Sequence, residues 1–244
     1  DIEGGTPLDS AARNGHIDCV HALIAAGADM SLADNEGHLP LHSAARNGHL
    51  TSIRALVSAG ADVNRVNLHH ATPLRFAATN GHVDCVHALI AAGADLSLAD
   101  NDGRMPLHSA AEMGHVGSIR ALVAAGADVN VRGRDGFTAL YLAAENNHLE
   151  AIKVLYKLGA DMSICHKSYS PADIASARGH EEAAARIQKM LAKIQGECGH
   201  CGSSSKRLSV CAGCEKVRYC SSECQKSAWK AHKRECAAVS VSVL

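Results

Sequence analysis

Seven of the ten cysteines in this 244-residue sequence lie close together, between positions 198 and 236. With one histidine they form four pairs whose members are separated by two or three residues: Cys198 and Cys201, Cys211 and Cys214, Cys220 and Cys224, and His232 and Cys236. A pair at this spacing can occupy one edge of a tetrahedral zinc site, and eight donors complete two such sites. A complete site has no position for an activated water, so the spacing predicts two structural Zn²⁺ ions.

Disulfide bonds are the competing use of clustered cysteines. The cluster has an odd number of them, the sequence shows no secretory segment, and disulfides would leave the spacing of His232 unexplained. The segment also has little apolar material, and domains below ~40 residues usually need a metal or disulfides to fold. We therefore predict zinc.

The first residue is Asp1 rather than Met, so we expect a partial sequence and leave a removed targeting segment open.

The ligand spacing and the stretch RYCSSECQKSAWKAHKREC, which includes Tyr219, resemble the MYND zinc finger over residues 198–236. In that family the ligand pairs interleave, which implies a cross-braced module with two defined ligand sets. Site one would use Cys198, Cys201, Cys220 and Cys224, and site two would use Cys211, Cys214, His232 and Cys236. A RING finger is the runner-up, but RING modules normally close with a Cys-x2-Cys pair and have a longer central spacing.

The resemblance also implies a function, since MYND fingers bind short peptides that are often rich in proline. It places Gln225 and Trp229 on the peptide-contacting surface, where the indole of the single tryptophan can offer an apolar platform. The alternative is that Trp229 packs against the zinc sites for stability. Some family members use a serine after the third cysteine ligand for peptide contact, whereas this chain has Ala212 there.

An internal repeat fills the sequence before the finger. Six similar stretches, such as TPLDSAARNGH at Thr6, start near positions 6, 39, 72, 105, 138 and 170, and all five prolines share one place in the unit. Threonine before proline is a good helix start, and glycines such as Gly15 and Gly48 suit a left-handed helix end. Stretches such as IDCVHALIAAG then have the apolar spacing of a second helix. The sequence predicts units of helix, turn, helix and projecting hairpin loop.

The 33-residue period and the TPLH, GH and GADVN elements closely resemble the ankyrin repeat over residues 1–195. The implied fold class is an all-α ankyrin solenoid plus the small two-zinc finger, with the finger at 196–237 and a tail at 238–244. Units one and three share CVHALIAAGAD, while units two and four share SIRAL, so the units alternate in an ABAB order. We expect residues 189–196 to finish the last helix and lead into the finger.

By resemblance, the array binds a protein partner on the concave face made by the loops and first helices. Arginine and aromatic side chains are the usual anchors of such interfaces. The candidate contacts are His38, Arg46, His69, Arg75, Phe76, Arg104, Met113, Arg134, Phe137 and Tyr141. The alternative for Phe76 is that it fills a gap between units. Two further candidates, Asn64 and Asn130, end stretches that resemble ankyrin sites of asparaginyl hydroxylases and equally match the repeat consensus.

The other histidines and cysteines of the repeats are expected to be structural. By resemblance, the histidines of the GH and PLH positions hydrogen-bond turns and loops. Cys19 and Cys85 share one helix position, and we expect both to be buried, inert thiols; Cys165 is assigned to repeat packing with them.

Composition favours an interaction protein over an enzyme. The 24 Lys and Arg against 25 Asp and Glu give a net charge of −1, so a wholly basic nucleic-acid binder is excluded and nucleic-acid binding is not expected. The aromatic content of 3% suits an interior of Ala, Leu, Ile and Val. No stretch approaches the ~18–20 apolar residues of a membrane span, and no nucleophile motif or phosphate loop is present. We predict a non-catalytic adaptor in the cytoplasm or nucleus.

Two alternatives stay open. MYND fingers occur within SET-domain lysine methyltransferases, so the chain can be a fragment of a larger enzyme. A RING-like interpretation of the finger would instead make the chain a ubiquitin-ligase component. The sequence names neither the partners nor the oligomeric state.

Overall fold

The computed structural model describes residues 4–196, 209–210 and 218–219. The helices are α1 (Pro7–Arg13), α2 (Ile17–Ala25), α3 (Pro40–Asn47), α4 (Leu50–Ser58), α5 (Pro73–Thr79), α6 (Val83–Ala91), α7 (Pro106–Glu112), α8 (Val116–Ala124), α9 (Ala139–Glu145), α10 (Leu149–Lys157), α11 (Pro171–Ala177) and α12 (Glu181–Gly196). Strands β1 (Ser209–Val210) and β2 (Arg218–Tyr219) pair antiparallel, with Ser209 opposite Tyr219. The predicted order of paired helices is confirmed, and 189–196 does finish the last helix.

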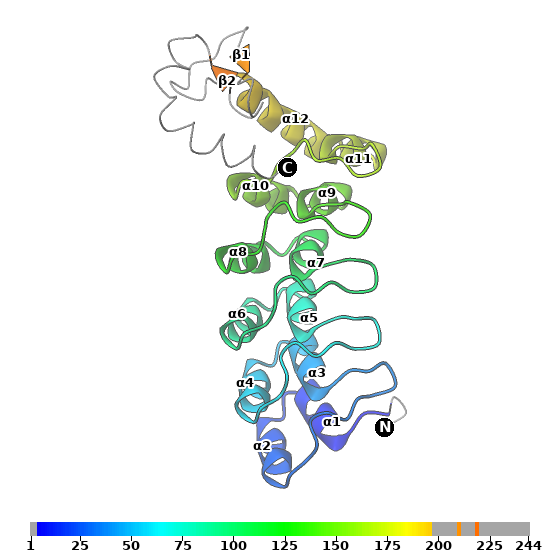
Figure 1. Ribbon diagram of the computed structural model, residues 1–244, viewed down its shortest axis with the longest axis vertical. Helices are drawn as coiled ribbons and strands as arrows, with labels where there is room; N and C mark the ends of the chain where they lie inside the picture. The colour runs from blue at the N-terminus through cyan, green and yellow to red at the C-terminus, as the bar shows by residue number, and fades with distance from the viewer. Residues whose placement is uncertain (1–3, 197–208, 211–217, 220–244) are drawn as a thin grey trace, which may run out of the picture. The chain divides into compact units, whose positions relative to one another are not determined.

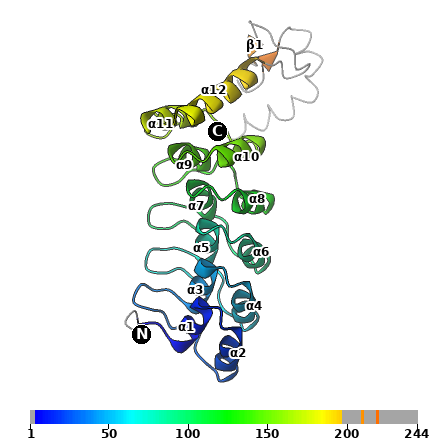
Figure 2. The same cartoon turned by 180° about the vertical axis from the view of Figure 1, so that it is seen from behind.

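The helices of the repeats stack in two columns (Figures 1 and 2). The first helices of successive units pack against one another from α1 to α11, and the second helices do so from α2 to α10. The hairpin loops project beside the first column; they are loop 1 (33–39), loop 2 (66–72), loop 3 (99–105), loop 4 (132–138) and loop 5 (165–170). The chain divides into two compact units, Asp1–Ala184 and Ala185–Leu244, and this stack belongs to the first.

The first helices of units one to five begin by one of two capping schemes, and α11 combines both, because Ser170 Oγ accepts the Asp173 N–H and Asp173 Oδ2 accepts the Ser170 N–H. Where the residue before proline is a threonine, its hydroxyl accepts the N–H three residues on, as Thr72 Oγ1 does from Arg75 at 3.2 Å. In units two and four that residue is Leu39 or Met105, which has no acceptor. The third helical residue is then a histidine, whose side chain accepts a hydrogen bond from the backbone of the residue before the proline. His42 Nδ1 accepts the Leu39 N–H at 3.1 Å. Either scheme satisfies one of the backbone donors that a helix start leaves unpaired.

The GH pair joins each unit to its neighbour. Gly81 has a φ of +72°, and a Cβ there would lie 2.5 Å from the imidazole Nδ1 of His115 in the next unit. Only glycine suits both the left-handed backbone and this close approach. In the same position of another unit, His49 Nε2 donates to the Arg13 carbonyl at 3.0 Å. The expectation that these histidines bond turns is confirmed there.

The core consists of aliphatic side chains repeated at fixed places. The first helices of units one to five each bury a leucine almost completely at the same position, namely Leu8, Leu41, Leu74, Leu107 and Leu140. The second helices bury Val20, Ile53, Val86, Ile119 and Ile152 in the same way. Burial of each such side chain stabilises the fold by roughly 1.5–3 kcal/mol. Paired alanines in these five first helices are also buried, which lets neighbouring helices pack closely and leaves little room for aromatic rings.

The prediction for Cys19 was wrong. Cys85 is buried, and burial raises the pKa of its thiol to about 11, which makes it inert. Cys19 has the same local sequence but is exposed. The reason is position: α6 packs between α4 and α8, whereas α2 contacts only α4 among the second helices of the described residues. Cys165 is also exposed, in loop 5, so it does not belong to the repeat packing.

Loop 5 is one residue shorter than loops 1 to 4, which accounts for the final 32-residue spacing. His166 and Tyr169 pair as a tight hairpin, and the two residues between them, Lys167 and Ser168, have φ values of +47° and +71°. Loops 1, 3 and 4 place a glycine at their left-handed position, and loop 2 places His70 there, with φ +56°. Loops 2 and 5 therefore hold strained non-glycine residues.

Candidate partner-binding surface

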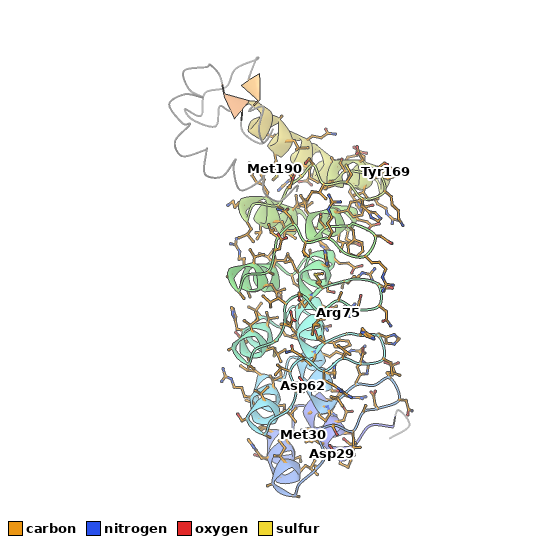
Figure 3. The ribbon with its side chains drawn as sticks, in the orientation of Figure 1. Asp29, Met30, Asp62, Arg75, Tyr169 and Met190 are labelled. Atoms are coloured by element: carbon orange, nitrogen blue, oxygen red, sulfur yellow. The ribbon has the colours of Figure 1, made fainter. Side chains whose placement is uncertain are left out.

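The predicted contact residues fall into three groups by exposure. Exposed side chains are Arg46, His69, Met113 and Arg134; half-buried ones are Arg75, Phe76 and Arg104; buried ones are His38, Phe137 and Tyr141. Figure 3 shows the side chains along the stack, with Arg75 in its middle part. The exposed and half-buried groups are available to a partner, and the buried group supports the surface from behind.

Two adjoining hollows lie between the first helices and the loops of units one to three. One has a volume of about 570 Å³ and is bounded by α1, loop 1 and α3. The other, of about 300 Å³, is bounded by loop 1, α3, loop 2, α5 and loop 3. Three side chains, Glu36, His38 and Arg46, line both. Of the ten predicted residues, the structure brings five together here: His38, Arg46, His69, Arg75 and Phe76.

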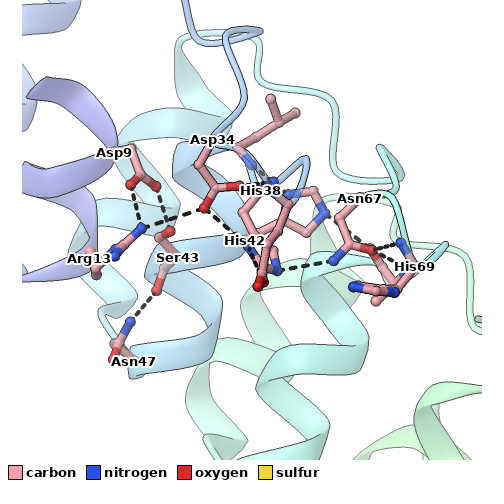
Figure 4. Close-up of polar contacts among 12 residues, drawn as sticks. Asp9, Arg13, Asp34, His38, His42, Ser43, Asn47, Asn67 and His69 are labelled. Atoms are coloured by element: carbon pink, nitrogen blue, oxygen red, sulfur yellow. Dashed lines mark hydrogen bonds and ion pairs between the residues drawn. The ribbon is translucent and has the colours of Figure 1, made fainter. Parts of the chain in front are cut away.

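A chain of polar contacts positions loop 1 against the first helices (Figure 4). Asp9 accepts hydrogen bonds from Ser43 Oγ at 2.5 Å and from Arg13 Nη2 at 2.9 Å. Arg13 Nη2 also lies 3.6 Å from Asp34 Oδ2, which is 3.2 Å from His38 Nδ1. Asp9 comes from unit one and Ser43 from unit two, so the contacts fix the two units and their loop together.

The same chain continues into loop 2. Asn67 Oδ1 accepts the backbone N–H groups of His69 and Ala71, so its amide nitrogen must donate, and it does so to His38 Nε2 at 3.0 Å. His38 therefore carries its proton on Nδ1, which donates to Asp34. Burial alone would raise the pKa of Asp34, but the N–H groups of His38 and Glu36 and the facing His38 ring hold that pKa below its ordinary value. The two loops are thus preorganised.

Sequence reasoning missed Asp34 and Asn67 as positioning residues. The signal was present, because Asp34, Asn67 and Asp100 occupy equivalent places at the start of loops 1 to 3. Asp100 performs a related role, since its carboxylate lies 2.7 Å from Arg75 Nη2. A short polar side chain at this place accepts backbone N–H groups of its own loop in each of the three cases.

Phe76 makes ring contacts with His38 of loop 1 and His42 of α3. His38 meets it edge-on at 5.3 Å between centroids and His42 at 6.0 Å. The guanidinium of Arg46 lies 5.7 Å from the centroid of the same ring. Phe76 therefore does fill space between units, yet it stays half-buried beside the second hollow. Its contact with a partner stays a prediction.

Buried histidines support this surface. The ring of His42 is 1% exposed, and its Nε2 donates to the Ala71 carbonyl at 3.1 Å. Burial lowers the pKa of His42 to about 4 and lowers that of His108, its counterpart in unit four. Within the described ranges, no group of three or more His, Cys, Asp or Glu side chains could hold a metal ion.

A third hollow, of about 410 Å³, lies between loops 3 to 5 and α9. Phe137 packs edge-on against His108 at 5.0 Å between centroids, and Tyr141 against His166 at 4.9 Å. Both aromatic side chains are less than a tenth exposed, and burial raises the pKa of the Tyr141 hydroxyl. Their aromatic rings belong to the support of this hollow, while the exposed Arg134 lies at its edge.

The two candidate hydroxylation sites bridge consecutive units. Asn64 Nδ2 donates to the Gly93 carbonyl at 3.2 Å, and its Oδ1 accepts the Asp95 N–H at 2.8 Å. Asn130 makes the same pair of bonds two units further along. An enzyme acting on either side chain would have to open these turns.

The eight predicted zinc ligands, with Gln225 and Trp229, lie outside the residues that the structure describes. What it does describe of the finger is the pairing of β1 and β2, which directly precede Cys211 and Cys220 in the sequence. None of the described helices is long and apolar enough to cross a membrane.

Family profiles agree with this division. The profile for ankyrin repeats in three copies matches residues 1–67 and 65–133, and the profile for many copies matches 122–175. The chain belongs to the ankyrin-repeat family. The MYND finger profile matches residues 198–236, so a MYND zinc finger follows the repeats.

Two curated relatives are similar to this chain over the finger region. SET domain-containing protein 14 of Caenorhabditis elegans is 40% identical over 47 residues, which are 19% of this chain and 11% of that protein. Histone-lysine N-methyltransferase SMYD3 of Homo sapiens is 46% identical over 39 residues, 16% of this chain and 9% of that protein. The chain therefore spans about a tenth of the length of these relatives.

Proposed function

We propose that this chain is a non-catalytic adaptor whose repeat array binds a protein partner while its finger binds a short, proline-rich peptide. The observation that carries the proposal is the pair of adjoining hollows on the concave face, bordered by Arg46, His69 and Phe76. Arginine and aromatic groups are typical anchors of protein interfaces, and the polar chain through Asp34 and Asn67 holds the loops ready for binding.

Affinity capture tests the two binding functions separately. The intact, zinc-loaded chain is compared with Arg75→Ala/Phe76→Ala, with Trp229→Ala, and with Arg54→Ala, an exposed arginine of α4 outside the concave face. We expect the first two variants to lose different sets of bound proteins and the Arg54 variant to lose none. A bound set that neither surface variant changes contradicts the proposal.

For the finger, we propose two structural zinc sites that interleave: Cys198, Cys201, Cys220 and Cys224 in one, and Cys211, Cys214, His232 and Cys236 in the other. Four thiolates, or three thiolates and an imidazole, are donor sets that zinc prefers. Metal binding supplies folding free energy on the order of 10 kcal/mol per site. Gln225 and Trp229 would then contact the peptide.

Metal counting on paired variants tests the interleaving. Elemental analysis should give two zinc ions per chain. Cys198→Ser/Cys224→Ser removes ligands of one site and should keep one zinc, whereas Cys198→Ser/Cys214→Ser removes a ligand from each site and should keep none. The reverse result would establish sequential rather than interleaved sites, and one zinc in the unaltered chain would contradict the two-site proposal.

A second candidate rests on the relatives, which are SET-domain and lysine methyltransferase proteins by their names. In this alternative the chain is part of a longer enzyme. Sequencing the full transcript distinguishes the two, because a SET-coding region joined to these repeats would replace the adaptor proposal with the enzyme one.

The adaptor would work inside the cell, in the cytoplasm or nucleus, where thiols stay reduced and available to zinc. Asn64 and Asn130 are proposed as sites of asparaginyl hydroxylation. Intact mass after incubation with an asparaginyl hydroxylase tests this, with a gain of one oxygen expected, and Asn64→Ala/Asn130→Ala as the control that should gain none.

A further inference from the structure

The duplicated units allow a comparison within the chain itself. Units one and three have the same second-helix sequence, at 18–25 in one and 84–91 in the other. Their first helices differ at three places, which are Asp9 against Arg75, Ser10 against Phe76 and Arg13 against Thr79. Units two and four keep PLHSAA and SIRALV but differ at all seven residues of 65–71 against 131–137. Packing positions are thus kept while positions on the concave face have changed.

The changes give the middle of the array a distinct character. Loops 1 and 3 carry Asn-Glu-Gly and Asn-Asp-Gly at their tips, whereas loop 2 carries Leu68, His69 and His70. Leu68 is 67% exposed, and His70 takes the left-handed backbone that the glycines take elsewhere. This tip has lost its carboxylate, so the second hollow has no acidic group on the loop 2 side.

Arg46 differs from the other two arginines that line the two adjoining hollows. Arg13, Arg75 and Arg104 each lie within 4 Å of at least one carboxylate, such as Asp100 for Arg75 at 2.7 Å. Arg46 has no carboxylate partner among the described residues and is instead held over the Phe76 ring. An arginine placed this way is preorganised, and its N–H donors stay available for a planar, bidentate acceptor.

The surrounding charges select the kind of acceptor. Asp34 is committed to Arg13 and His38, and Asp100 to Arg75, but Glu36 lines both hollows and is 65% exposed. A phosphate dianion or a nucleic-acid backbone would be repelled by these carboxylates more strongly than a single carboxylate would. The site therefore favours a singly charged anion over a polyanion.

We propose that Arg46, laid over Phe76 between the two hollows, docks an Asp or Glu carboxylate from an extended segment of the partner protein. This inference rests on the proposed function, because it assigns the chemistry that the concave face recognises. Unit four carries Glu112 where unit two carries Arg46, and Arg104 lies 3.3 Å from it, so the second duplicate cannot offer the same cation. The acidic side chain thereby sets the position of the partner along the array.

The experiment uses the zinc-loaded full chain and a displayed library of random dodecapeptides. Peptides whose binding survives Trp229→Ala are scored as binders of the array. We expect them to be enriched in Asp and Glu, and we expect Arg46→Gln to weaken them at least tenfold, while Arg54→Gln on α4 leaves them unchanged. In the peptide that binds most tightly, replacing the acidic residue by its amide should weaken binding to the unaltered chain by a similar factor. The same replacement should not weaken binding to the Arg46→Gln chain any further.

The outcomes separate the two proposals. The carboxylate site is overturned if array-binding peptides keep their affinity in the Arg46→Gln chain, or if their acidic residue contributes equally with and without Arg46. Either result leaves the adaptor function supported. A peptide that binds tenfold more tightly with phosphoserine in place of its acidic residue also overturns it, because the preferred anion is then a phosphate. If no peptide binds the array, both proposals fail for peptide partners.

Discussion

The buried ring of His42 should make the stability of the array depend on pH. Its Nδ1 accepts the Leu39 N–H and its Nε2 donates to the Ala71 carbonyl, both at 3.1 Å, so protonation would place a proton against a donor. The pKa is lowered to about 4 from 6.5 because the ring is buried. In the unfolded chain the His42 ring becomes protonated below about pH 6.5, whereas in the folded chain it becomes protonated only near pH 4.

The sign and size follow from that difference. The stabilising contribution is complete above pH 6.5 and is lost as pH falls toward 4, with a limit of roughly 3 kcal/mol for a difference of this size. Between pH 7.5 and pH 5.0 the loss is about 2 kcal/mol by the same relation. Replacing His42 by glutamine removes the titration while keeping an amide that can both accept and donate.

Urea unfolding followed by circular dichroism at 222 nm measures the effect. At pH 7.5 we expect His42→Gln to be less stable than the unaltered chain by about 1–2 kcal/mol, because its hydrogen bonds fit less well. At pH 5.0 the gap should close or reverse. His21→Gln, at an exposed position of α2, is the matched control and should follow the unaltered chain at both values. An equal pH-dependent loss in all three proteins would refute the reasoning.

Three further substitutions test the backbone and packing. Gly81→Ala should cost about 1 kcal/mol more than Gly93→Ala in urea unfolding, because both have positive φ but only Gly81 meets a neighbouring ring; equal costs would remove the steric argument. Ser52→Ala should raise the melting temperature by about 1–3 °C, since the buried hydroxyl has no hydrogen-bond partner within the described part of the chain; a drop would show that the hydroxyl is bonded. Ser168→Gly should stabilise by about 1 kcal/mol by relieving the +71° φ; a loss of stability in urea unfolding would place that residue at negative φ.

Much of the fold could be predicted from the sequence because the same helix-start and helix-end residues recur in successive repeats. Proline at the first helical position and glycine at the left-handed end recur at a 33-residue period, and both act within one or two helical turns. The second capping scheme was readable too: where Leu39 replaces threonine, a histidine stands three residues later. The structure brings five of the ten predicted contact residues together at two hollows, which the sequence did not indicate, and the binding of a partner there stays a prediction.

The sequence could not show which of several chemically similar side chains are buried by neighbouring units. Cys19 and Cys85 share their neighbours in sequence, yet one is exposed and one buried, because burial depends on a helix from another unit. Phe137 and Tyr141 were chosen as exposed anchors by residue type, whereas histidines from loop 5 and α7 pack against them. Residue type indicates what a side chain can do, and its neighbours in space decide whether a partner can reach it.

By itself, then, the sequence determined the period, the order of paired helices, the aliphatic interior and the pairing of donors that predicts zinc, because each depends on spacing along the chain. Only the tertiary structure decided that Asp34, His38 and Asn67 form one chain of contacts across loops 1 and 2, and that Arg46 lies over Phe76 without a carboxylate partner among the described residues. The contacts of His38 with Asn67 and of Arg46 with Phe76 join residues about 30 positions apart, and their distances are set by how closely the repeats stack.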